Sequence, residues 1–231
     1  MPTTTSSELT MWRTLFTNIS IIAVLLVSGC SQQLQRQTCV LLTPQVNYCL
    51  APLMTLSDQE LAPQNSQQQL TQKISFTHGD KHHELLTQLE LSPEMMTMVG
   101  LAPLGQALFT VTYDGETVVS QQNVLMGDDF KAEYLMAIMQ LIYRPHQQVN
   151  PYFSQGQMQD VACEADNYSD KNRDDNRDDN RDDNRDNGKC SALIVDNEAA
   201  IQISYSDLNP WIAEVILRFP AANITLSISP L

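Results

Sequence analysis

Apolar and polar residues alternate along this chain in short segments that are separated by turn residues. Such alternation is typical of antiparallel strands that bury one face. It predicts strands at 73–77, 83–91, 96–99, 107–113, 117–120, 201–205, 211–219 and 223–228. His78-Gly79-Asp80-Lys81 and Asp114-Gly115 supply hairpin turns, because glycine permits positive φ and aspartate binds its own backbone.

One segment changes to a helical period. Phe130, Tyr134, Ile138 and Leu141 recur at helical spacing and predict an amphipathic helix over 129–143. Asp128 or Asp129 is the expected cap at its start, and Arg144-Pro145 ends it. Residues 52–72 are expected to form a loop with one short helical turn. The pattern as a whole predicts an α+β fold, in which a curved antiparallel sheet is interrupted by one helix.

The N-terminal segment has the pattern of an export signal. Arg13 precedes an apolar run that starts at Ile19 and ends in Val27-Ser28-Gly29-Cys30. This ending resembles a bacterial lipoprotein signal, which implies cleavage after residue 29 and acylation of Cys30. The alternatives are an ordinary signal peptide and a transmembrane anchor, but the run is shorter than the roughly 20 residues that span a bilayer.

Two details refine the expected location. Ser31 follows the lipidated cysteine, and similarity to enterobacterial lipoproteins, where Asp at this position favours the inner membrane, implies the outer membrane, facing the periplasm. Met11 as well as Met1 fits as the start of the signal. Residues 1–29 are therefore expected to be a signal peptide, 30–50 a lipidated tether with a first disulfide loop, and 51–231 a single domain. Within this division, 31–38 is expected to be flexible.

Composition excludes one class of partner. The formal net charge is -14, which argues against nucleic acid and against attraction to anionic head groups. The roughly 200 residues after the signal suffice for one domain with a sizeable core.

The cysteines other than Cys30 are predicted to form structural disulfides, as expected in an oxidising periplasm. Three connectivities are possible, and we favour Cys39–Cys49 with Cys163–Cys190, because each closes a local loop. The rival interpretation is a four-thiolate metal site, but the chain has no C-x-x-C pair.

The segment 164–189 differs from the rest of the chain. It repeats Asn-Arg-Asp-Asp from Asn172 onward and has no apolar core pattern. Closely spaced carboxylates suit calcium, but an arginine occupies every repeat and the turn glycine of known calcium loops is missing. A disordered, inert insertion is the favoured interpretation.

Catalytic patterns are weak. The sequence has no G-x-S-x-G, no glycine-rich phosphate loop and no H-E-x-x-H. The group formed by His78, Asp80, His82, His83 and Glu84 is expected to be an exposed polar hairpin rather than a metal site, because neighbouring strand residues point to opposite faces. We therefore predict a protein that is not an enzyme and holds no metal or cofactor.

One loop is apolar instead of polar. Gly100-Leu101-Ala102-Pro103-Leu104-Gly105 joins two predicted strands and carries two leucines between glycines. Leu101 and Leu104 either pack under the sheet or protrude as a tip that contacts lipid or a partner.

These residues carry a resemblance. A strand, Pro103-Leu104-Gly105, a second strand and a helix, behind a lipoprotein signal, are similar to the outer-membrane lipoprotein receptor family LolB. That resemblance implies that Leu104 protrudes and helps to deliver lipoproteins into the membrane. The blocks 100–105, Tyr113-Asp114-Gly115 and 135–145, with the closing strands, also resemble a family of uncharacterised lipoproteins often encoded beside aryl-polyene or fatty-acid-type synthesis genes. The resemblance covers about 73–145 and 200–231.

The resemblance implies a half-open LolA/LolB-like β-barrel with the helix packed on its concave side. The cavity for an apolar ligand would be lined by residues of the adjoining elements. The candidates are Met96, Met98, Phe109, Met136, Met139 and Trp211. These methionines equally suit the filling of core gaps. The function expected is binding or transfer of an acyl-type ligand, such as a lipid, a polyene or a lipoprotein acyl chain. The alternative is a non-catalytic, membrane-anchored interaction or assembly protein with a filled barrel, which docks another periplasmic or outer-membrane protein.

Overall fold

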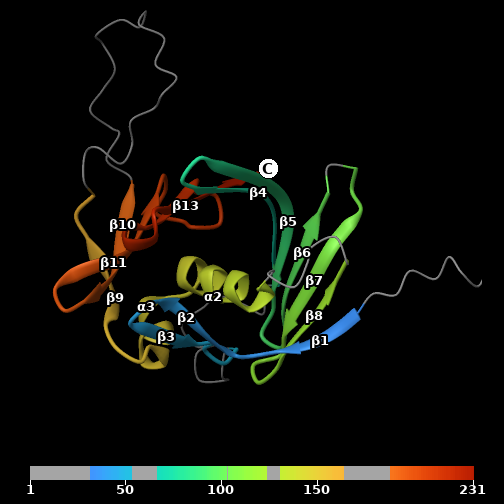
Figure 1. Ribbon diagram of the computed structural model, residues 1–231, viewed down its shortest axis with the longest axis horizontal. Coiled ribbons are helices and arrows are strands. Elements are labelled where there is room, and N and C mark those ends of the chain that lie inside the picture. The colour runs from blue at the N-terminus through green and yellow to red at the C-terminus, as the bar shows by residue number, and fades with distance from the viewer. Residues whose placement is uncertain (1–31, 54–66, 103, 124–130, 164–187) are drawn as a thin grey trace, which may run out of the picture. The chain divides into compact units, whose positions relative to one another are not determined.

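The computed structural model describes residues 32–53, 67–102, 104–123, 131–163 and 188–231 (Figure 1). Almost all of these belong to one compact unit, Gln33–Leu231. Cys30, Asp128 and Asp129 lie outside the described residues, as does the interior of the repeat insertion.

The unit is built mainly from strands. They are β1 (Gln32–Arg36), β2 (Cys39–Thr43), β3 (Val46–Cys49), β4 (Gln68–His78), β5 (Lys81–Leu91), β6 (Met96–Leu101), β7 (Ala107–Tyr113), β8 (Val118–Gln122), β9 (Gln157–Val161), β10 (Lys189–Val195), β11 (Glu198–Tyr205), β12 (Val215–Phe219) and β13 (Ile224–Pro230). The helices are α2 (Ala132–Tyr143) and the short α3 (His146–Val149), with 3-10 turns η3 (Asn150–Tyr152) and η5 (Pro220–Ala222).

One 11-stranded sheet contains every described strand except β2 and β3, which form a separate hairpin. Its order is β1-β8-β7-β6-β5-β4-β13-β12-β11-β10-β9, so the sheet is not closed and has β1 and β9 at its edges. From β8 across to β9 every neighbouring pair is antiparallel. Strand β13, at the C-terminal end of the chain, joins the two halves by pairing with β4.

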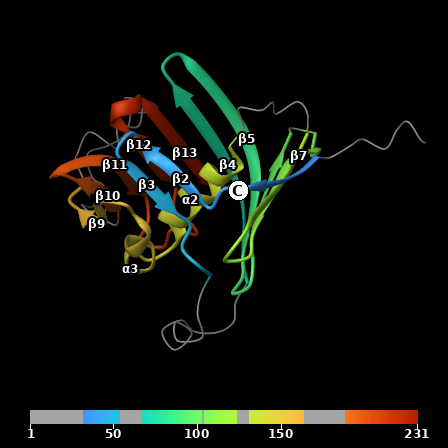
Figure 2. The same ribbon diagram turned by 60° about the horizontal axis from the view of Figure 1, so that its bottom comes forward.

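Helix α2 lies on the concave side of this curved sheet. Figures 1 and 2 show it between strands β4–β8 on one side and β9–β13 on the other. Met136, Met139 and Leu141 of α2 have no exposed surface, and they share one hydrophobic cluster with the inward residues of the strands. The predicted α+β fold with a curved antiparallel sheet is thus confirmed.

Local sequence explains these elements. Met96 and Met98 on β6, and Phe109, Val111 and Tyr113 on β7, alternate with more exposed residues, as a strand with one buried face requires. The predicted turns are present, since Gly79 and Gly115 have φ of 56° and 97°. Helix α2 ends before Pro145, because proline restricts the preceding residue to extended backbone, and Arg144 has ψ of 147°.

Several segments differ from the sequence expectations. The expected disulfide loop within 30–50 forms the β2–β3 hairpin, and α2 begins at Ala132 with Lys131, not an aspartate, at its cap position. The tether expected at 31–38 contains strand β1, and β4 begins at Gln68 within the expected loop. Strands β9 and β10 were not predicted, because β9 is mostly exposed and polar and β10 is buried on both faces, so neither alternates cleanly. The strand expected at 211–219 starts only at Val215, after a turn.

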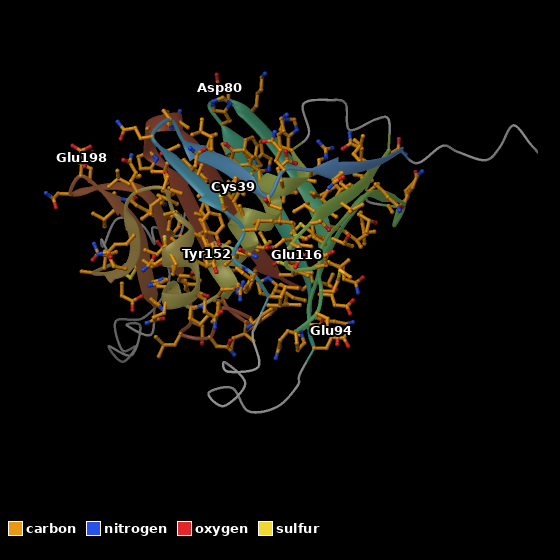
Figure 3. The ribbon with its side chains drawn as sticks, turned by 90° about the horizontal axis from the view of Figure 1, so that it is seen from below. Cys39, Asp80, Glu94, Glu116, Tyr152 and Glu198 are labelled. Carbon is orange, nitrogen blue, oxygen red and sulfur yellow. A yellow bond between two sulfur atoms is a disulfide. The ribbon has the colours of Figure 1, made fainter. Side chains whose placement is uncertain are left out.

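Both predicted disulfides are confirmed. Cys39 and Cys49 are directly opposite each other in the β2–β3 hairpin, where Figure 3 shows Cys39. Cys163, two residues after the end of β9, is bonded to Cys190 on β10. The polar β4–β5 hairpin tip is exposed, as expected, and Asp80 in its turn points away from the sheet (Figure 3).

Candidate functional site

The β6–β7 hairpin presents one leucine to solvent. Leu104 is 98% exposed, whereas Leu101, at the end of β6, is half-buried. The turn between them is tight, because the N–H of Ala102 donates to the carbonyl of Gln106 and the N–H of Gly105 to that of Ala102, both at 2.8 Å. Of the two arrangements weighed from the sequence, Leu104 therefore protrudes. Pro103 lies outside the described residues.

The two glycines of this loop are required for different reasons. A Cβ on Gly100 would lie 2.1 Å from the ring of Phe109, the residue directly opposite it on β7. Gly105 has open space around it but a φ of 79°, which residues with a side chain rarely adopt. Gly100 thus leaves room for the buried ring of Phe109 to pack across the hairpin, and Gly105 allows the backbone conformation of the turn.

The residues expected to line a cavity lie in the core. Met96, Met98, Phe109, Met136 and Met139 each have at most 2% of their surface exposed. A side chain with no accessible surface borders no void large enough for water, so Met98, Met136 and Met139 fill the space around α2. Trp211 is half-buried and packs against the same core, with its ring stacked on Tyr143 at 4.7 Å between centroids.

The concave face is less completely covered towards the β4–β5 turn. Phe76, Leu85 and Ile224 are half-buried and pack against the core from three adjacent strands. The register places all three on the face that also carries the buried Ile74 and Leu226. We call these three residues the rim cluster, because they mark an apolar margin of the concave face that solvent reaches.

Buried amides, which sequence analysis missed, connect α2 to the rest of the unit. Oε1 of Gln140 accepts hydrogen bonds from the hydroxyl of Tyr48 at 2.7 Å and from the N–H of Ala51 at 2.8 Å. Oε1 of Gln72 accepts one from the hydroxyl of Tyr143 at 2.7 Å. Both glutamines are completely buried, so these bonds fix the position of the helix.

A charged group at the start of α2 was missed as well. Arg36 on β1 donates from Nε to the hydroxyl of Ser120 at 2.8 Å and from Nη2 to Oε1 of Gln122. The same Nε lies 3.9 Å from Oε2 of Glu133, in the first turn of α2, and both charged side chains are almost buried. An ion pair therefore links strand β1 to helix α2.

His146, at the start of α3, gives a pH prediction. Burial lowers the pKa of His146 from its ordinary value of 6.5, and Lys189 adds to this, whereas Asp160 opposes it. The unfolded chain therefore takes up a proton near pH 6.5 that the folded protein takes up only at lower pH, so acid favours unfolding. In urea titrations, we expect the free energy of unfolding to fall more between pH 7 and pH 5 for the wild type than for His146→Gln. Equal pH dependence in the two proteins would contradict this.

Other kinds of site are not supported. Within the described residues, no group of three or more His, Cys, Asp or Glu is placed to hold a metal ion. None of the helices described is long and apolar enough to cross a membrane.

A family model described as "Protein of unknown function (DUF3261)" matches residues 69–231. The chain belongs to this family. The matched part runs from β4 to the C-terminus and so contains the Leu104 hairpin, α2 and the rim cluster. Strand β1, with Arg36, and the β2–β3 hairpin precede it. No curated protein matches the sequence.

Proposed function

We propose that this DUF3261 protein is an outer-membrane lipoprotein, anchored through Cys30 and facing the periplasm, that binds or transfers an acyl-type ligand. The fold proposed for this role is a half-open LolA/LolB-like barrel with α2 on its concave side. Two or more acyl chains on Cys30 would hold the protein at the membrane surface. The activity requires recognition of an apolar chain and no catalytic group.

The observation that carries the proposal is the exposure of Leu104. Leu104 is 98% exposed on a turn held by two backbone hydrogen bonds, so nearly its whole side chain is available to a membrane or a ligand. Moving such a side chain from water into lipid gains about 1.5–3 kcal/mol. The gain is enough to bias the hairpin towards a membrane or an acyl chain, yet small enough to be reversible, as transfer requires.

The rim cluster is the proposed entry point for the acyl chain. Phe76, Leu85 and Ile224 offer apolar surface that solvent already reaches, whereas the space next to α2 is filled. A chain that starts at the rim can extend only by displacing core side chains. Met136 and Met139 suit this displacement, because unbranched thioethers repack at low cost.

A second candidate function is favoured by a different observation. The absence of exposed surface on Met98, Met136 and Met139 supports a barrel that is filled by its own side chains. In that case the protein would be a non-catalytic, membrane-anchored assembly protein, and Leu104 would contact another protein instead of lipid.

The variant Leu104→Glu tests the proposal. With the full chain in detergent-free vesicles, we expect transfer of a fluorescently labelled fatty acid to acceptor vesicles to be at least tenfold slower, because a carboxylate cannot enter the apolar phase. Far-UV circular dichroism should be unchanged, since the side chain contacts no core residue. Leu41→Glu is the matched control, because Leu41 on β2 is a leucine that is 49% exposed elsewhere. Unchanged transfer by Leu104→Glu would exclude the hairpin from the activity, and absence of transfer by the wild type would favour the assembly function.

A further inference from the structure

A cavity of about 270 Å³ opens at the C-terminal end of α2, bordered by the start of α3 and by strands β9, β10 and β11. Its apolar wall includes Ile142, Leu208 and Pro210, and its polar lining includes His146, Asp160 and Lys189. A concave site with an apolar wall and a few converging polar groups is the usual form of a small-molecule site.

His146 and Lys189 both lie close to the same carboxylate oxygen of Asp160. Oδ1 of Asp160 lies 3.2 Å from Nζ of Lys189 and 3.8 Å from Nδ1 of His146. The side chains of Lys189 and Asp160 are 39% and 67% exposed, so both can reorient towards a ligand, whereas that of His146 is only 14% exposed. Burial lowers the pKa of His146, so the imidazole is neutral at neutral pH.

Arg144 also lines the cavity, but it is only 8% exposed, and its Nη1 donates to the carbonyls of Ala51 at 3.0 Å and Pro52 at 2.7 Å. The exposed charged groups that face a ligand are thus one cation and one anion, beside a neutral imidazole. An anionic ligand that takes Lys189 would separate it from Asp160 and place two negative charges side by side. A cationic ligand that takes Asp160 would likewise leave Lys189 without its partner. A ligand with both charges replaces the Lys189–Asp160 ion pair by two ion pairs, one with each side chain. No charge of the protein or of the ligand is then left without a partner.

We propose that this cavity binds a small zwitterionic group in which an ammonium is linked to a phosphate or carboxylate. The ammonium lies against Asp160 and the anionic group against Lys189, within reach of the His146 ring. The apolar wall accepts the carbon skeleton attached to these charges. Such a group comes either from a free metabolite or from the head group of a zwitterionic lipid. The proposal does not depend on the role proposed for Leu104, which lies on a different hairpin.

Isothermal titration calorimetry on the full chain in a non-ionic detergent tests this site with O-phosphoethanolamine. We expect saturable binding, and at least tenfold weaker binding of ethanolamine alone and of inorganic phosphate alone. Lys189→Gln and Asp160→Asn should each weaken phosphoethanolamine binding at least tenfold. The matched control is Lys73→Gln, which removes a lysine paired with Glu84 at 3.4 Å on β4 and should leave binding unchanged.

Vesicle flotation separates the two sources of the ligand. If Lys189→Gln reduces binding to phosphatidylethanolamine vesicles but not to vesicles of phosphatidylglycerol, whose head group has no ammonium, the site takes a lipid head group. If only soluble phosphoethanolamine binding depends on Lys189, the site takes a free zwitterion. The proposal is overturned if phosphoethanolamine does not bind, if phosphate binds equally well, or if Lys189→Gln and Lys73→Gln behave alike.

Discussion

Replacing Gln140 by leucine is expected to lower the free energy of unfolding by about 4 kcal/mol, although leucine is apolar and of similar size. The change removes the acceptor of two buried hydrogen bonds, from the Tyr48 hydroxyl and the Ala51 N–H. Each donor would then be buried without its partner, at a cost of roughly 1–3 kcal/mol. Urea denaturation followed by circular dichroism measures the loss.

Gln121→Leu is the control for this change, because Gln121 lies on β8 with its side chain exposed. It should alter stability by less than about 0.5 kcal/mol. A Gln140→Leu protein as stable as the control would mean that the buried amide does not hold α2 against the segment from Tyr48 to Ala51.

Arg36→Met is expected to cost about 3 kcal/mol, because it leaves the carboxylate of Glu133 almost buried without its cation. It also removes the hydrogen bonds to Ser120 and Gln122 that join β1 to β8. Lys73→Met breaks an exposed pair with Glu84 and should change the free energy of unfolding far less, because solvent screens an exposed ion pair.

The double variant Arg36→Met/Glu133→Leu separates charge from packing. If Arg36→Met destabilises the protein because it leaves the buried charge of Glu133 without a partner, removing that charge as well should restore most of the lost stability. A double variant that is less stable than Arg36→Met would contradict this explanation. Hydrogen exchange of the β1 amides would show in addition whether the strand detaches.

The sequence predicted the fold where burial is one-sided. Alternation located β4 to β8 and β11 to β13 at least in part, because each of these strands buries one face and exposes the other. Alternation does not reveal β10, because both of its faces are buried, or β1, because its pairing with β8 joins residues distant in sequence. Local loop closure was sufficient to choose the disulfide pairing.

The buried polar residues are marked less clearly in the sequence than the strands are. Gln72 continues the alternation of Leu70 and Ile74, and Gln140 follows Met136 by four residues on the buried face of α2. A glutamine in phase with apolar residues is therefore a marker for a buried amide. The pairing of Arg36 with Glu133 has no such marker, since 97 positions separate the two residues.

The exposure of Leu104 was one of two arrangements that the sequence left open. The pattern of apolar residues between glycines cannot distinguish a leucine under the sheet from one at the tip, because both positions are compatible with the same turn. The structure decides between them through the hydrogen bonds of Ala102 and Gly105.

Native mass spectrometry with lipid extraction, on the full chain purified from its own cell envelope, tests whether the protein binds an acyl chain. We expect a non-covalent acyl-containing species at near-stoichiometric amount, in addition to the mass of acyl groups on Cys30. A protein free of non-covalent lipid that also fails to displace a fluorescent fatty-acid probe would contradict acyl binding. That result would leave the filled-barrel assembly protein as the better explanation.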